Sequence, residues 1–420
     1  MRKFLGVIFC CCGLTVAESP LVTLDGVGIR SLGMANNYTA VANDYSAIFW
    51  NPAGLSFIPI REVHAGFGGS SQSMESELNG MTTDYKRSVF QFNSAGLVRS
   101  IPTSRGGLTF AMGYSAPYSF SECAKYSGTD VYLNTKEALG VSGVDTIFAG
   151  DTLWYDNVKY YASGNLGMWS GAAGWQVAEH LGFGVTASFL YGKQLSHKSI
   201  LSHTRKGTFD DGADIASNVT YTGFDLRFGG LYQVNNFVSI GARLEIPQVV
   251  RYNGTLTYES ASEKIKGQLR SSFAGGLGGA ITLPFAIISV DGTFRAPNAD
   301  VDSGNLSYWK VGSGIGVEVP VEPMNAMFRC GYTWKEFDQY PYAEYVDDTL
   351  VVNTSDAVDS DGAVHLITAG ATFVLSKSVI LDLAYANTRY SSELVAYDWM
   401  NTVKKTSSKH RGAVSIAIRY

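Results

Sequence analysis

The chain has 420 residues, of which 45% are hydrophobic, 13% aromatic and only 16% charged, with a formal net charge of −5. Soluble proteins usually carry charge on about a quarter of their residues, so the composition argues against a set of soluble domains. The small negative charge offers no basic surface for nucleic acid. Beyond the first residues, no stretch reaches the roughly 18 unbroken apolar residues of a membrane helix. Many aromatic residues without such a helix are typical of a membrane β-barrel.

Residues 1–17 have the pattern of a secretory signal peptide. Two basic residues come first, Leu5–Ala17 is apolar, and its last residues are small enough for cleavage. Three of the five cysteines lie in this leader, and lipidation of one of them is the alternative interpretation. The mature chain keeps Cys123 and Cys330, which do not make a disulfide framework.

The mature chain opens with Gly26–Phe57, which lacks the alternation of a β-strand. Apolar residues within Ala40–Trp50 are spaced for a short amphipathic helix. Pro52 should end this helix, because the residue before a proline is disfavoured in helical conformation. Gly54 should let the chain turn away.

From Arg61 onward, apolar and polar residues alternate with period two, most clearly in Phe237–Ile246. In a membrane barrel the apolar face contacts lipid and the polar face lines the lumen. Tyr191, Tyr232 and Trp334 end apolar faces and suit interfacial girdles. Fourteen segments fit this pattern: Arg61–Ser70, Ser88–Ile101, Gly106–Ser115, Asn165–Val177, Leu181–Gln194, Thr220–Val234, Phe237–Arg251, Gly267–Leu283, Ala286–Ala296, Ser307–Val319, Ala326–Lys335, Val364–Leu375, Val379–Tyr390 and Gly412–Tyr420.

Short and long connections alternate along these segments. Asn235-Asn236 and Pro284-Phe285 are short, whereas Ser71–Arg87 and Ala116–Gly164 are long polar loops. Outer-membrane barrels have this asymmetry, with short periplasmic turns and long external loops. The last segment ends in an aromatic residue and resembles the C-terminal signal of the barrel-assembly machinery, which we expect as a partner during biogenesis. An ordinary edge strand is the alternative.

The N-terminal stretch resembles the hatch of the FadL/TodX family of outer-membrane transporters for long-chain fatty acids and other hydrophobic compounds. The resemblance rests on GVGIRSLGMANNYTAVANDYSAIFWNPAGL, which spans Gly26–Leu55. It implies an all-β fold: a transmembrane antiparallel β-barrel of about 14 strands over residues 61–420, with a plug containing a short helix over residues 18–60. It also implies gating by Asn51, Pro52, Ala53 and Gly54.

The same resemblance sets the expected location and partners. The protein should lie in the outer membrane of a Gram-negative-type bacterium, in contact with its lipid, and should bind a hydrophobic, fatty-acid-like small molecule. It implies no cofactor and no metal. PorV-type barrels of the type IX secretion system share the N-terminal signature, so a surface-assembly shuttle that binds exported proteins is the alternative function.

Arginines on the inferred lumen face are candidate ligands for an acyl carboxylate, because a guanidinium group pairs bidentately with a carboxylate. The alternative, favoured because barrel lumens are commonly charged, is an internal ladder of ion pairs. The candidates are Arg227, Arg243, Arg270, Arg295 and Arg329.

Other features give weaker indications. The apolar content of Ala116–Gly164 suits either a capture site for ligand or a self-packed cap. Asp300–Gly304 and Asp359–Gly362 resemble calcium loops but lack the distal glutamate, so solvated turns are favoured. The six histidines are scattered and no nucleophile motif occurs, so we do not expect an enzyme.

Overall fold

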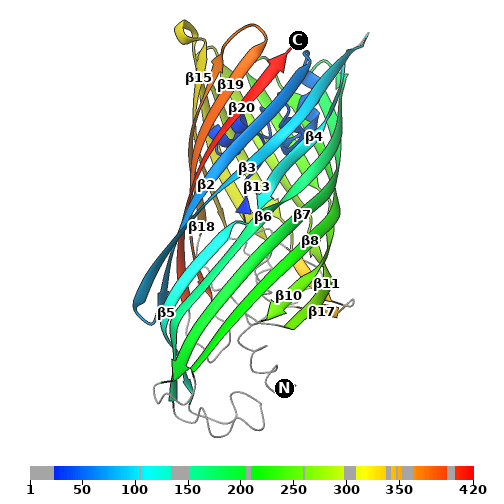
Figure 1. Cartoon of the computed structure of the whole chain (residues 1–420). Coiled ribbons are helices and arrows are strands. Elements are labelled where there is room, and N and C mark those ends of the chain that lie inside the picture. Colours follow the sequence, from blue (N-terminus) through cyan, green and yellow to red (C-terminus); the bar gives the residue numbers. More distant parts are fainter. Residues whose placement is uncertain are drawn as a thin grey trace.

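The computed structural model describes residues 23–103, 106–133, 151–204, 210–258, 261–297, 309–336, 342–346, 349–351, 363–394 and 403–420. Within these ranges the chain forms a closed antiparallel β-barrel of 14 strands (Figure 1), so the predicted fold class is confirmed. The barrel closes where β20 pairs with β2. Among the described helices, none has the length and apolar content needed to cross a membrane.

Most wall strands are single elements: β2 (Glu62–Leu78), β3 (Met81–Pro102), β6 (Asp151–Ala178), β7 (Leu181–Thr204), β8 (Asp210–Gln233), β13 (Ala286–Arg295), β14 (Lys310–Val321), β15 (Ala326–Glu336), β18 (Ala363–Val374), β19 (Val379–Leu394) and β20 (Val403–Arg419). The other wall strands are interrupted: β4 (Gly107–Ser119) with β5 (Glu122–Leu133), β9 (Val238–Glu245) with β10 (Val249–Tyr258), and β12 (Ala274–Leu283) with β11 (Ala261–Ser271). A hairpin of β16 (Tyr342–Val346) and β17 (Thr349–Val351) extends the edge of β11.

Every predicted segment coincides with a wall strand, but the strands run further on the side of the long connections. The predicted loop Ser71–Arg87 is wrong, because β2 and β3 continue through it to a tight turn. That turn has positive φ angles at Asn79 (49°) and Gly80 (80°), as a two-residue hairpin requires. Residues 134–150, in the middle of the predicted loop Ala116–Gly164, lie outside the described residues; its flanks are strands.

The predicted faces are also found. On β8, Phe224 is 73% exposed on the outside, whereas Arg227 is 1% exposed on the inside. Arg270 is an exception: it pairs with the outward Val249, so the prediction that it faces the lumen is wrong. The break at residues 272–273 between β11 and β12 reverses which residues point inward, because one extra residue flips every side chain to the other face.

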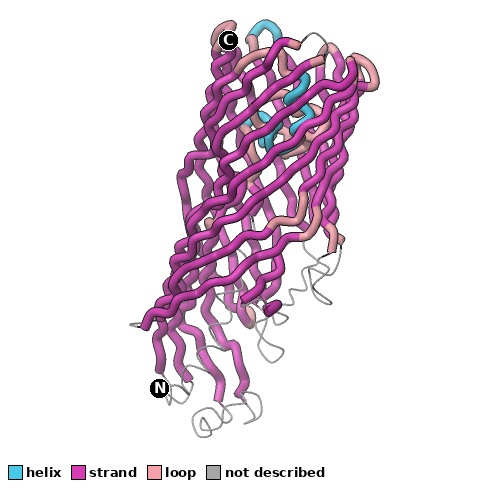
Figure 2. Tube along the Cα trace, turned by 90° about the vertical axis from the view of Figure 1, so that its right-hand side faces the viewer, coloured by secondary structure: helices cyan, strands magenta, loops and turns pink. Residues whose placement is uncertain are grey.

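The N-terminal part of the described chain, residues 23–60, lies inside the barrel, and we call it the hatch. It contains β1 (Thr23–Leu24), α2 (Ile29–Gly33), α3 (Ala47–Trp50) and the 3₁₀ helix η1 (Pro52–Phe57). Its helices sit in the lumen near the end that carries the C-terminus (Figures 1 and 2). The short turns of the wall are at this end, and the long connections are at the other.

Two local predictions about the hatch need correction. The helix predicted over Ala40–Trp50 is only the four residues of α3. Asn51 is extended before Pro52, as predicted, but the chain then enters η1 instead of turning away at Gly54. Gly54 is needed for a close contact, since a Cβ atom there would lie 1.8 Å from the carbonyl oxygen of Ala42.

Candidate functional site: the hatch and the cavity beside it

The Asn51-Pro52-Ala53-Gly54 segment makes contacts both with the rest of the hatch and with the wall. The Asn51 side chain accepts a hydrogen bond from the Ala53 amide (3.1 Å) and donates to the carbonyl oxygens of Thr39 (2.7 Å) and Gly230 (3.1 Å), the latter on β8. Wall glycines make room for η1: a Cβ atom on Gly184 would lie 2.2 Å from the Pro52 carbonyl carbon. This predicted gating segment is therefore packed directly against the wall.

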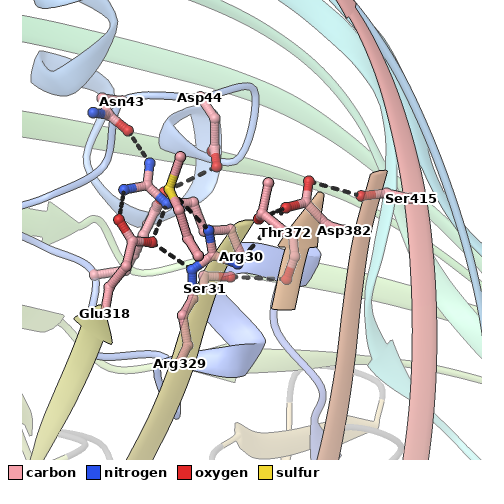
Figure 3. Close-up of polar contacts among 12 residues, drawn as sticks. Arg30, Ser31, Asn43, Asp44, Glu318, Arg329, Thr372, Asp382 and Ser415 are labelled. Carbon is pink, nitrogen blue, oxygen red and sulfur yellow. Dashed lines mark hydrogen bonds and ion pairs between the residues drawn. The ribbon is translucent and has the colours of Figure 1, made fainter. Parts of the chain in front are cut away.

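A cluster of charged side chains attaches α2 to the opposite side of the wall (Figure 3). Arg30 donates two hydrogen bonds of 2.9 Å to the two carboxylate oxygens of Glu318 on β14. Arg329 on β15 also donates to Glu318, and it lies 3.7 Å from Asp382 on β19. All of these side chains are at most 15% exposed. The predicted ligand residue Arg329 thus pairs with acids that hold the hatch.

The start of the hatch, residues 23–28, forms an N-terminal arm along the wall. β1 pairs with Tyr118 and Ser119 of β4, and the amides of Asp25 and Gly26 donate to the Pro117 carbonyl oxygen (2.7 and 3.2 Å). The β3–β4 ladder ends at Ser94 and Ser115, so the arm lies where β4 has separated from β3. The arm therefore covers a discontinuity in the wall.

The Asp25 side chain anchors this arm to β20. Its Oδ1 atom lies 2.8 Å from Lys409 Nζ, and Arg411 donates a hydrogen bond to the backbone carbonyl oxygen of Asp25. Burial disfavours the Asp25 carboxylate, but the charges of Lys409 and Arg411 outweigh burial and hold its pKa below the usual value. Asp25 is therefore an anion fixed among wall cations.

A cavity of about 220 Å³ lies between the hatch and the wall, beside Asp25. It reaches the ends of β13, β14, β15 and β18 that carry the long connections, so it lies on that side of the hatch. Aromatic side chains, including Phe49, Trp50 and Phe294, supply apolar surface. Its charged lining comprises the cations Arg243, Arg295, Lys310, Lys335, Lys409 and Arg411 and the acids Asp25, Glu245, Asp291 and Glu336.

The predicted ligand arginines fall into two groups. Arg227 is buried between Asp225 (2.7 Å) and Glu245 (3.4 Å), and its guanidinium carbon lies 3.9 Å from the ring centre of Phe49. Like Arg329, Arg227 thus forms ion pairs with acidic side chains of the wall, and it also contacts the hatch through Phe49.

Arg243 and Arg295, in contrast, line the cavity. Arg243 stacks over Trp50 at 5.0 Å. One terminal nitrogen of Arg243 lies 3.8 Å from Glu245 Oε1, whereas its Nε atom is buried without a hydrogen-bond partner among the described residues. Sequence reasoning missed Lys409 and Arg411, because both precede Gly412, where the last strand was predicted to begin. The structure places them in β20, where they alternate with outward residues.

No group of three or more histidine, cysteine, aspartate or glutamate side chains in the described ranges is arranged to hold a metal ion. The aspartate-rich segments Asp300–Gly304 and Asp359–Gly362 lie outside these ranges.

Comparisons with known proteins identify the fold. No protein-family profile matches the sequence, and no curated protein matches it either. A structure of a FadL homologue from Pseudomonas aeruginosa superposes with a TM-score of 0.64, covering 95% of this chain and 99% of that one at 11% identity.

Two structures described as toluene transporters give similar results. TodX from P. putida has a TM-score of 0.57 at 13% identity, and TbuX from Ralstonia pickettii 0.56 at 15%, each over 95% of this chain and 99% of the other. At these identities the similarity establishes a shared fold, a hatch-containing barrel of the FadL/TodX type.

Proposed function

We propose that this protein carries hydrophobic molecules with an acidic head group, such as long-chain fatty acids, across the outer membrane. The observation that carries the proposal is the cavity, which combines aromatic surface with more cationic than acidic side chains. The shared fold with a FadL homologue and with toluene transporters supports the general class of cargo. The cations favour an anionic amphiphile over a neutral hydrocarbon, because arginine and carboxylate form strong charge-assisted hydrogen bonds.

The domain limits and processing are part of the same proposal. Residues 1–17 are removed on export, residues 18–60 form the hatch and residues 61–420 form the barrel. In this scheme Arg243 and Arg295 bind the head group, while Arg227 and Arg329 hold the hatch in place. A hydrogen bond from the buried Arg243 Nε atom to the ligand is favourable, because a buried donor without a hydrogen-bond partner costs about 1–3 kcal/mol.

Transport requires the hatch to move. The head group of the cargo competes with Asp25 for Lys409 and Arg411, and its arrival releases the N-terminal arm from β4. The acyl chain of the cargo then leaves the lumen sideways, through the discontinuity between β3 and β4 that the arm covers. Transfer into lipid is favourable because each methylene removed from water contributes about 0.8 kcal/mol. Movement of Asn51-Pro52-Ala53-Gly54 widens the route.

Binding of a long-chain carboxylate and of its uncharged methyl ester to the purified barrel tests the head-group assignment. Arg243→Gln should weaken binding of the carboxylate about tenfold, the loss of one charge-assisted hydrogen bond, and leave the ester unchanged. Arg251→Gln is the matched control, because Arg251 is exposed on the outer face of β10. Equal affinity of the wild-type barrel for acid and ester would contradict the proposal. Stable co-purification of an exported protein, without bound lipid, would instead indicate the shuttle function.

A further inference from the structure

An apolar groove lies on the outer face of the barrel, across the wall from α2 of the hatch. It has a volume of about 540 Å³ and crosses β3, β2, β20, β19 and β18, which are consecutive in the wall. Gly69 and Gly412 pair directly and form its floor. Phe90 flanks this pair on one side and Tyr385 on the other, since each pairs with one of the two glycines.

The groove floor is open. A Cβ atom on Gly412 would meet no other atom within 4 Å, and Phe90 and Tyr385 are 76% and 49% exposed. Two neighbouring glycines between two large rings therefore leave a notch in the outer face of the wall. A lipid chain has the shape and polarity to fill it. Because lipid tails are as apolar as the groove, chain packing alone supplies little selectivity.

Polar and cationic side chains lie directly beyond the groove, toward the long loops. The next outward row contains Ser88, Ser71, His410 and Asn387, which pair across the strands. The row after that contains Lys86, Ser73, Ser408, Arg389 and His365. These two rows carry four basic side chains, Lys86, Arg389, His365 and His410, and no acidic one.

The basic groups of this patch are held in place by neighbours. Arg389 Nε donates to Asn387 Oδ1 (2.9 Å), and within the described part of the chain its terminal nitrogens make no hydrogen bond or ion pair. The His410 ring is positioned by the Tyr385 hydroxyl (2.6 Å) and by Ser408 (3.3 Å). Arginine of this kind can bind phosphate bidentately.

We propose that this surface binds a phosphorylated, multiply acylated glycolipid of the outer leaflet, with one acyl chain in the groove and a phosphate on Arg389. The charge complementarity selects an anionic lipid, and the row of serine and asparagine side chains suits sugar hydroxyls. The inference rests on the outer-membrane orientation in the proposed function, since the long loops place the polar rows at the outer-leaflet surface. It is independent of the lumen and its cargo.

Native mass spectrometry of the purified barrel tests the site with three lipids: a phosphorylated hexa-acyl glucosamine disaccharide, its dephosphorylated form, and phosphatidylglycerol. Wild-type barrel should bind the first at least about tenfold more tightly than the other two. Gly412→Leu places a side chain in the groove, where its Cβ atom meets no other atom within 4 Å, and should abolish the adduct with the phosphorylated lipid. Gly279→Leu is the matched control, because Gly279 faces outward on β12 and also has open space at Cβ.

A second pair of variants separates the head-group contact from chain packing. Arg389→Gln should remove the preference for the phosphorylated lipid, whereas Lys193→Gln, on the exposed face of β7, should keep it. Fatty-acid uptake by the Gly412→Leu barrel should remain at the wild-type level, so failure of this inference is distinguishable from failure of the transport proposal. Three outcomes would overturn the proposal. The three lipids could bind equally, Gly412→Leu could keep the lipid adduct, or Gly412→Leu could lose a protein dimer instead of a lipid adduct.

Discussion

The Asp25→Asn substitution should release the N-terminal arm from the barrel wall. In the wild-type protein the Asp25 carboxylate lies 2.8 Å from Lys409 Nζ, and the two side chains are only 7% and 3% exposed. Removing one partner of a buried ion pair costs about 3–5 kcal/mol, because the other charge stays buried without compensation. Asparagine keeps one hydrogen-bond acceptor, so we expect the lower end, about 3 kcal/mol. This corresponds to about a hundredfold shift toward the released arm.

Hydrogen exchange measured by mass spectrometry detects this release. The Asp25 and Gly26 amides donate to Pro117 in the closed state and should exchange about a hundredfold faster in Asp25→Asn. Peptides from β20 should keep their protection, since that strand pairs with β19 and β2 along its whole length. Asp84→Asn on the exposed face of β3 is the control. The reasoning would be refuted by unchanged exchange in residues 23–28.

The same variant reports on the cargo. Because Asp25 competes with the head group for Lys409 and Arg411, its neutralisation should increase the affinity for a long-chain carboxylate. A weaker affinity would mean that Asp25 does not occupy the position of the ligand anion.

Three further outcomes are expected. Gly54→Ala should displace the hatch, because its Cβ atom would overlap the Ala42 carbonyl oxygen at 1.8 Å; limited proteolysis of the hatch measures this, and an intact hatch would contradict it. Glu318→Gln should weaken the docking of α2 on the wall by about 3–5 kcal/mol, because it removes the ion pairs with Arg30 and Arg329 shown in Figure 3. Glu322→Gln, at an exposed position, should leave this docking unchanged. Hydrogen exchange of the α2 amides measures both, and equal exchange in the two variants would contradict the expectation. The pKa of Asp25 is lowered in the folded protein, so its contribution to arm docking is fully present above the unfolded value of about 3.9 and is lost as pH falls through the lowered pKa. Arm protection should therefore be constant from neutral pH down to about pH 4 and then decrease, and a loss near pH 6 would point to another group.

The wall of the barrel could be predicted from local sequence because the alternation of apolar and polar residues depends only on neighbours within one strand. A period-two pattern places Phe224 outside and Arg227 inside wherever a strand is uninterrupted. The pattern fails at the break between β11 and β12, where one extra residue reverses the face of Arg270. The strand ends on the side of the long connections were also missed, because these largely polar stretches were interpreted as loops, although Met74 and Leu78 in β2 still alternate with outward polar residues.

The hatch was recognised from its lack of alternation and from its resemblance to the hatch of the FadL/TodX family, but its contacts could not be predicted. Asp25 and Lys409 are 384 positions apart, and no spacing rule connects them. The role of Gly54 depends on the neighbouring Ala42 backbone, which only the folded hatch brings close. The division of the predicted arginines between the hatch and the cavity is likewise a property of the assembled barrel.

Reversible locking of the hatch tests gated transport most directly. Gly33 in α2 faces Gly370 in β18: a Cβ atom on Gly33 would lie 3.3 Å from Gly370 Cα. Cysteines at both positions are therefore close enough to form a disulfide bridge. Uptake of a labelled long-chain fatty acid by cells expressing Gly33→Cys/Gly370→Cys should stop when the bridge forms and return on reduction, while each single variant transports throughout. Undiminished uptake with a fully formed bridge would contradict the conclusion that hatch movement opens the barrel.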